Sequence, residues 1–268
     1  MTSEKKWFVE TITDETYRTK FLTLPKIISE WMAEHGGLAG KDILDFGCGE
    51  ATAALGIALQ YEPRRVVGVE IQQVELDRCL PHARDQLRLE SLPENFSLHC
   101  VEPGMLPNRD DQFDLIYSWS VFEHIDQSLF PRMLDSLRSL LKPEGFLFIQ
   151  VAPLYYSAEG SHMMPWVPEP WGHLLNQHDI YYSKLASAVR DPEQLRLLWS
   201  TYRTLNRITA PGLVTLVRQA GLEIVRDYRT KDEYVIPSEL AEIFQPEILS
   251  TNQIVLLLRK GENSSVPR

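Results

Sequence analysis

Cysteine is scarce in this chain of 268 residues, and its placement excludes two classes of protein. The three cysteines, Cys48, Cys79 and Cys100, form no close pair along the sequence. A disulfide framework or a structural zinc site needs paired or clustered cysteines, so we expect neither. Residues 1–15 lack the apolar core of a signal peptide. Scattered cysteines without an export signal favour a cytoplasmic protein.

Long apolar runs and an excess of positive charge are also missing. The longest apolar stretch, residues 145–156, is too short to span a bilayer and contains Gln150 and Pro153. The 27 basic and 37 acidic residues give a net charge of −10. An acidic chain is repelled by phosphate backbones and by anionic membranes, so we expect neither a nucleic-acid nor a membrane partner. With 44% hydrophobic and 24% charged residues, the composition is that of an ordinary globular protein.

From Lys41 onward, short apolar runs alternate with segments of helical periodicity. The pattern predicts strands at 42–46, 65–71, 96–101, 113–118, 145–152, 222–228 and 253–260. It predicts helices at 50–60, 74–89 with a kink at Pro81, 128–141, 192–204 and 211–220, the last capped by Gly221. Strands that alternate with helices indicate an α/β fold whose parallel sheet is covered on both faces.

Two segments do not follow this alternation. Residues 1–40 form a predicted N-terminal helical cap, in which 13–35 carry one or two amphipathic helices with Pro25 near a first turn. Residues 153–205 begin with a stretch crowded with proline, histidine, tryptophan and tyrosine, which predicts a substrate cap inserted after the fifth strand. We therefore interpret 41–260 as one domain with an insertion, followed by a disordered tail at 261–268.

The glycine-rich stretch LDFGCGEAT, residues 44–52, joins the first predicted strand to a helix. Gly47 and Gly49 allow a tight turn and a close approach to a ligand, and the helix N-terminus attracts an anionic group. A plain connecting turn would leave the same pattern. Thr52 stands where the dinucleotide fingerprint needs a third glycine, which disfavours a nicotinamide dehydrogenase. Glu70 closes the second strand, where an acid binds ribose hydroxyls, unless it is only a solvated strand end.

Four motifs in order carry a resemblance to a known family. They are LDFGCG, Glu70, FDLIYSWSVFEHI at 113–125 and LKPEGFLFI at 141–149. Together they resemble the class I S-adenosylmethionine-dependent methyltransferases that act mostly on small molecules. The resemblance covers 40–152 well and 205–260 loosely. It implies S-adenosylmethionine as cofactor and a Rossmann-like, doubly wound, mostly parallel seven-stranded sheet with an antiparallel last strand.

The resemblance also implies which residues bind the cofactor. The glycine loop would hold the methionine part of the cofactor, and Glu70 would bind its ribose. Glu102 would contact the adenine amino group. Trp119 and Ser120 would lie under the sulfonium. Ala51 stands where the family often has a third glycine. The full expected cofactor-binding set is Asp45, Gly47, Cys48, Gly49, Glu70, Ile71, Glu102, Trp119 and Ser120.

The Glu123–His124 pair follows the fourth predicted strand. In quinone-biosynthesis relatives an E-x-x-E-H arrangement has been associated with a metal. Ser120 replaces the first acid of that arrangement here, so we expect no metal site. The pair either fixes the loop by hydrogen bonds or lines the junction between methyl donor and acceptor.

The expected function is methyl transfer to a small molecule, with an oxygen acceptor and a sugar or related metabolite as one option. A hydroxyl acceptor needs a base, for which His162 and His173 are the first candidates and His124 the next. Each of them is otherwise a packed or solvated histidine, and an amine acceptor would need no strong base. The alternatives are a protein or nucleic-acid methyltransferase, and an inactive domain that binds cofactor or a partner protein.

Overall fold

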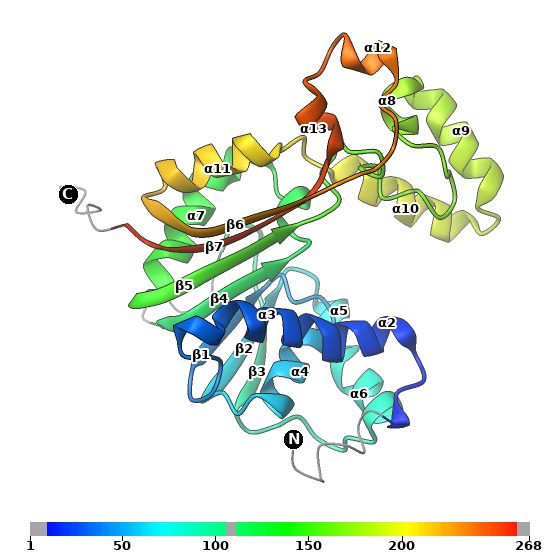
Figure 1. Cartoon of the computed structure of the whole chain (residues 1–268). Coiled ribbons are helices and arrows are strands. Elements are labelled where there is room, and N and C mark those ends of the chain that lie inside the picture. Colours follow the sequence, from blue (N-terminus) through cyan, green and yellow to red (C-terminus); the bar gives the residue numbers. More distant parts are fainter. Residues whose placement is uncertain (1–9, 106–110, 262–268) are drawn as a thin grey trace. The chain divides into compact units, whose positions relative to one another are not determined.

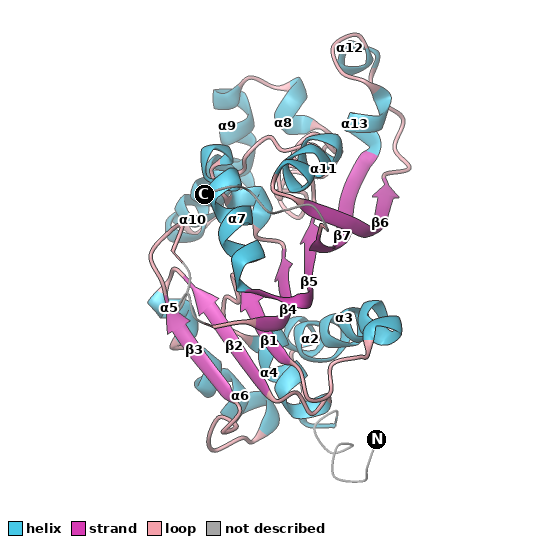
Figure 2. Ribbon diagram, turned by 90° about the vertical axis from the view of Figure 1, so that its left-hand side faces the viewer, coloured by secondary structure: helices cyan, strands magenta, loops and turns pink. Residues whose placement is uncertain are grey.

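A seven-stranded sheet organises the chain (Figure 1). The computed structural model describes residues 10–105 and 111–261. The strands run along the chain as β1 (Asp42–Phe46), β2 (Arg65–Glu70), β3 (Phe96–Cys100), β4 (Phe113–Trp119), β5 (Leu141–Val151), β6 (Leu222–Lys231) and β7 (Thr251–Lys260). Their order in the sheet is β3-β2-β1-β4-β5-β7-β6. Helices lie on both faces of this sheet (Figure 2), so the predicted doubly wound α/β fold is confirmed.

The helices fall between the strands and in two further segments. The α-helices are α2 (Glu15–Arg18), α3 (Leu24–Met32), α4 (Thr52–Gln60), α5 (Gln73–Leu76), α6 (Cys79–Leu87), α7 (Phe130–Leu140), α8 (Gly172–Leu175), α9 (His178–Ala188), α10 (Pro192–Thr204), α11 (Ala210–Gln219), α12 (Ser238–Ala241) and α13 (Pro246–Ser250). The tighter or wider turns are η2 (Thr19–Thr23), η3 (Ala33–His35), η4 (Phe122–His124) and η5 (Gln127–Leu129). No described helix has the length and apolar character that crossing a membrane requires.

The strand order reverses direction at β1. This strand pairs in parallel with β2 on one side and with β4 on the other, although β4 comes later in the chain. All five residues of β1 are buried, which explains why DILDF has no polar-apolar alternation. Open α/β sheets bind ligands beyond the carboxyl ends of the strands at such a reversal. The expected site therefore lies where β1, β2 and β4 end.

The chain divides into two compact units. The first comprises Met1–Trp119 with Asp135–Phe148, and the second comprises Ser120–Leu134 with Ile149–Arg268. In the first unit, the helical turn η2 packs on α4 at Gly56. A Cβ at this position would lie 2.3 Å from the Phe21 carbonyl oxygen, so only glycine permits the contact.

The N-terminal prediction of helix over 13–35 is confirmed, since α2, η2, α3 and η3 follow one another, with Pro25 in the first turn of α3. The prediction of one kinked helix over 74–89 is wrong. The chain forms α5 and α6 instead, and the break comes before Pro81. A proline ring clashes with the carbonyl of the residue four positions earlier, and this clash favours two helices over one.

The second unit contains more helix than the sequence predicts. Helix α10 spans 192–204 as expected, but α9 was not predicted. A further excursion, residues 232–250, leaves the sheet between the antiparallel strands β6 and β7. Trp171 from the segment after β5 packs with Leu240 and Leu249 of this excursion in one apolar cluster. The predicted tail lies, apart from Gly261, outside the described residues, and the proposed division into caps and core stays a prediction.

Candidate functional site

The loop between β1 and α4 has an unusual backbone. Gly47 and Gly49 have φ angles of 78° and 53°, and Ala51 has a φ of 55°. Three alternate residues therefore adopt the left-handed conformation, including the alanine that stands where the family often has glycine. A Cβ built on Gly49 meets no atom within 4 Å. The loop thus leaves open space directly beside its backbone, at the carboxyl end of β1.

Glu70 connects the end of β2 to this loop. One carboxylate oxygen accepts a hydrogen bond of 3.0 Å from the Gly49 amide. The other accepts from the amides of Ile71, at 2.8 Å, and Gln72, at 3.2 Å. The side chain remains half-buried at the edge of the sheet. Glu70 therefore fixes the glycine loop and still offers lone pairs at the surface, because a carboxylate has about four acceptor positions.

Asp45 lies below the loop and does not reach solvent. Its carboxylate accepts a hydrogen bond of 2.6 Å from the Tyr117 hydroxyl on β4. Burial raises the pKa of Asp45 to about 7, the Tyr117 hydrogen bond opposes that shift, and the charge of Glu70 adds to it. The side chain joins β1 to β4 beneath the edge where the loop turns.

The other predicted cofactor residues differ in exposure. Ile71 is 53% exposed, and Glu102 is also exposed. The thiol of Cys48 would lie 2.9 Å from a Cβ at Gly68, so it packs against β2, and burial raises its pKa. Trp119 stacks on Phe148 of β5 with a centroid distance of 6.1 Å.

Ser120 belongs to the second unit and is held there by Gln150. Its φ is 53°, which is unusual for a residue with a side chain. The Gln150 side-chain oxygen accepts from both the amide and the hydroxyl of Ser120, at 2.9 and 3.0 Å. The sequence gives no sign of this contact, because thirty positions separate the two residues.

The Glu123–His124 pair lies in the turn η4. Glu123 is buried, and among the described residues neither of its carboxyl oxygens has a hydrogen-bond partner. Burial raises the pKa of this carboxyl to about 8, so it is neutral at pH 7. The described residues contain no group of three side chains that suits a metal ion.

Two of the three candidate histidines lie together. The rings of His124 and His162 are 5.5 Å apart and nearly perpendicular. His124 Nδ1 is 2.9 Å from the Thr204 hydroxyl, and His162 Nε2 donates to the Pro153 carbonyl at 3.3 Å. Burial lowers the pKa of both, that of His162 to about 4 with the neighbouring His124 contributing. Both imidazoles are therefore neutral near pH 7.

His173 has a different environment. It is 6% exposed, and its Nε2 donates to the Tyr155 carbonyl at 2.6 Å. Its Nδ1 is buried and has no hydrogen-bond partner among the described residues. The rings of Tyr155 and Tyr181 pack against it, at 5.0 and 6.3 Å. Burial lowers the pKa of His173 to about 4. Its remaining lone pair points into packed protein, where an acceptor has no direct access.

Known proteins share this architecture. A model of the methyltransferase domain family matches residues 19–227, which is more than half of the chain. An S-adenosylmethionine-dependent methyltransferase of Clostridium acetobutylicum superposes with a TM-score of 0.56 at 14% identity, covering 90% of this chain and 92% of that one. The magnesium protoporphyrin IX methyltransferase of Synechocystis, solved with bound S-adenosylhomocysteine, gives 0.54 at 13% identity, covering 91% and 85%. At such identities the likeness concerns the fold alone.

Curated relatives match a shorter region. The mitochondrial ubiquinone biosynthesis O-methyltransferase of Dictyostelium discoideum is 30% identical over 125 residues, which are 43% of this chain and 36% of the relative. The ubiquinone biosynthesis O-methyltransferase of Coxiella burnetii is 31% identical over 111 residues, 41% of this chain and 43% of the relative. The matched region thus spans less than half the length of these relatives.

The family match, which covers more than half of the chain, defines the class as the S-adenosylmethionine-dependent methyltransferases, with S-adenosylmethionine as cofactor. Within that class, the chain belongs to the methyltransferase domain family. The sheet edge fits such a cofactor. The space beside Gly49 admits a ligand against the backbone, and Glu70 presents a half-buried carboxylate next to it.

Proposed function

We propose that the cofactor binds at the edge formed by the glycine loop and Glu70. The open space beside Gly49 supports this position, because the backbone there is uncovered. Glu70 would accept hydrogen bonds from the ribose hydroxyls, as an acid at the end of the second strand does in related folds. Asp45 would act through the loop and Tyr117, since its buried carboxylate is engaged inside the sheet.

We further propose that the chain transfers a methyl group to an oxygen atom of a small-molecule acceptor. The observation that carries this proposal is His124, a neutral imidazole in the turn that follows β4. It follows Trp119 by five positions, so the chain keeps its Cα within about 18 Å of the end of β4. The names of the matched relatives, which are O-methyltransferases, support an oxygen acceptor. The net charge of −10 counts against a nucleic-acid substrate.

In this function the protein's residues align the acceptor and take up its proton. S-Adenosylmethionine supplies an electrophilic methyl group when bound. An acceptor hydroxyl is a weak nucleophile until a base removes its proton, and a neutral imidazole suits that task near pH 7. His124 would be this base, with His162 beside it. His173 fits the task less well, because its free nitrogen is enclosed by packed protein.

A labelled-methyl assay tests the proposal. S-Adenosylmethionine carrying a labelled methyl group is incubated with the protein and with matched phenols, sugars and amines. We expect label in hydroxyl acceptors and little in amines. His124→Ala should lower kcat by about 10²–10⁴-fold, the usual contribution of a general base, and leave S-adenosylhomocysteine affinity unchanged. His178→Ala, at an exposed position of α9, is the matched control.

Three outcomes would contradict the proposal. Label confined to amines would make the base unnecessary. A His124→Ala variant with the wild-type kcat would remove His124 from the reaction. Label in a protein or nucleic acid, but in no small molecule, would favour the macromolecular alternative.

A further inference from the structure

The turn that carries His124 is held by residues that lie eighty positions later in the chain. Asn206 donates through its side-chain amide to the carbonyls of Phe122 and Ile125, both at 2.6 Å. Its backbone amide donates to the Glu123 carbonyl at 2.7 Å. One residue thus binds three of the four carbonyls of residues 122–125, and all of these groups belong to the second unit.

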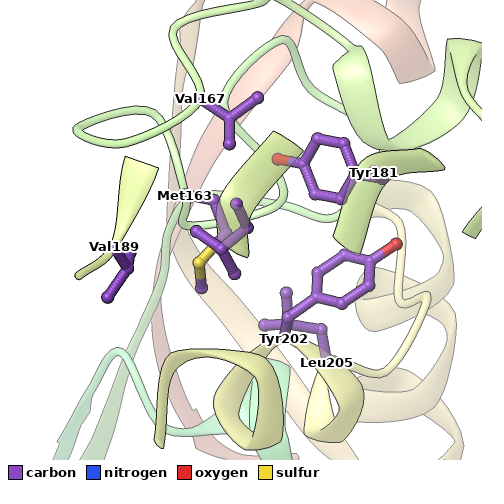
Figure 3. Close-up of a cluster of buried hydrophobic side chains, with 7 residues drawn as sticks. Met163, Val167, Tyr181, Val189, Tyr202 and Leu205 are labelled. Atoms are coloured by element: carbon purple, nitrogen blue, oxygen red, sulfur yellow. The ribbon is translucent and has the colours of Figure 1, made fainter. Parts of the chain in front are cut away.

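Asn206 follows directly on a helix end that is itself anchored. Tyr202 and Leu205, at the end of α10, lie in a buried apolar cluster with Met163, Val167 and Tyr181 (Figure 3). Helix α10 also contacts η4. Thr204 lies in the sequence between Tyr202 and Leu205, the two residues in the cluster, and its own side chain is exposed. The cluster therefore fixes the position of the Thr204 hydroxyl without covering it.

The hydrogen bond with the Thr204 hydroxyl determines which ring nitrogen of His124 carries the proton. Thr204 Oγ1 donates its single proton to the Thr201 carbonyl at 2.7 Å. That carbonyl lies in the last turn of α10, where helix carbonyls have no partner within the helix. The hydroxyl oxygen can then only accept from His124 Nδ1, 2.9 Å away. Nδ1 therefore carries the hydrogen, and the lone pair of the neutral ring is on Nε2.

We propose that Thr204 is a positioning residue that fixes His124 in its Nδ1–H tautomer and so makes Nε2 the proton acceptor of methyl transfer. Asn206 holds the turn in the orientation that this hydrogen bond requires. The inference deepens the proposed function and rests on it for its catalytic part. Its structural part, the tautomer, is independent of the acceptor.

The proposed methyl transfer accounts for every proton and electron pair. The acceptor hydroxyl gives its proton to Nε2 of His124, and the hydroxyl oxygen forms its bond to the methyl carbon as the carbon–sulfur bond breaks and leaves its electron pair on sulfur. The imidazolium formed still donates from Nδ1 to Thr204, whose oxygen therefore supports both protonation states. The imidazolium then returns the proton to solvent.

The test compares Thr204→Val, which removes the hydroxyl at nearly constant shape, with Thr204→Ser, which keeps it. Thr215→Val is the matched control, because the Thr215 hydroxyl also donates to a helix carbonyl, that of Pro211, but bonds no histidine. We expect Thr204→Val to lower kcat about tenfold, the effect of one lost hydrogen bond, and Thr204→Ser to restore it. Affinity for S-adenosylhomocysteine should be unchanged in all three variants.

The second readout is the histidine tautomer, observed by nitrogen-15 NMR of the free protein. Wild type and Thr204→Ser should show His124 with the proton on Nδ1, and Thr204→Val should lose that preference while its other histidine signals stay unchanged. A wild-type protein with the proton on Nε2 would overturn the inference. So would a Thr204→Val variant that keeps both the Nδ1–H tautomer and the wild-type kcat.

The two readouts separate the inference from the proposed function. If the tautomer changes as expected but no hydroxyl acceptor takes up label, then Thr204 sets the tautomer and the oxygen acceptor is wrong. If hydroxyl acceptors are methylated but Thr204→Val leaves the tautomer unchanged, then the proposed function stands and the positioning role is wrong.

Discussion

The Tyr117 hydroxyl donates to the buried Asp45 carboxylate at 2.6 Å, joining β4 to β1 directly below the glycine loop. Both side chains are buried, so no water is available to replace a lost partner. The contact crosses the point where the strand order reverses, and it ties β4 to β1, the strand that leads into the glycine loop of the proposed cofactor edge.

Tyr117→Phe should therefore destabilise the protein. Above the Asp45 pKa of about 7 the acceptor is a charged carboxylate. A hydrogen bond to a charged group contributes about 1.5–3 kcal/mol, and we expect the free energy of unfolding to fall by that amount in urea titrations at pH 8. Tyr17→Phe is the matched control. The Tyr17 hydroxyl is also buried, but it has no hydrogen-bond partner among the described residues, so its removal should be neutral or stabilising. Equal losses in the two variants would show that the Asp45 contact adds nothing.

The raised pKa of Glu123 should make the free energy of unfolding depend on pH. Its pKa is about 8 in the folded protein, whereas a solvated glutamate has an ordinary pKa of 4.5, so between these pH values the unfolded chain ionises while the folded protein stays neutral. The unfolded state then binds fewer protons, and stability falls as pH rises by about 1.4 kcal/mol per unit. At pH 7 the accumulated cost is about 3 kcal/mol.

Glu123→Gln removes the ionisable group and should remove this cost. We expect the variant to match wild type near pH 5 and to be more stable than wild type near pH 8, as measured by thermal melting at both pH values. A constant difference across this range would mean that Glu123 keeps an ordinary pKa in the folded protein.

Metal removal should leave activity unchanged. Ser120 stands where an E-x-x-E-H arrangement would have its first acid, and the described residues hold no cluster of three suitable ligands. Turnover in the labelled-methyl assay should be the same before and after dialysis against EDTA. Loss of turnover that magnesium restores would reveal a ligand set that this interpretation lacks.

The sequence predicts what is locally encoded. An apolar run predicts the buried strand DILDF, and the glycines after it predict a turn. The spacing along the chain predicts Glu70 at the end of the second strand. Position 51 departs from the family pattern, yet Ala51 adopts the left-handed φ of 55° that a glycine there would provide. The resemblance was thus a better guide to the backbone at this position than residue preference.

The contacts around His124 have no such local signal. Thr204 and Asn206 lie eighty or more positions from their partners, and neither belongs to a motif. Helix α9 and the excursion at 232–250 have no clear local signal, because their buried side chains pack on residues from other segments of the chain. Tyr181 of α9 packs in the cluster of Met163 and Tyr202, and Leu240 of the excursion packs in the cluster of Trp171. The sequence could not rank His124 above His173 as the candidate base for the same reason. The two histidines differ in their surroundings, which come from residues distant in the sequence.

The most direct test of the account is the affinity of the Glu70→Ala variant for S-adenosylhomocysteine, measured by calorimetry. The lost charge-assisted hydrogen bonds should weaken binding about ten- to a hundredfold in a variant that remains folded by circular dichroism. Glu30→Ala, which removes the same charge from the exposed face of α3, should bind as wild type does. An unchanged affinity in Glu70→Ala would contradict the placement of the cofactor at this edge of the sheet.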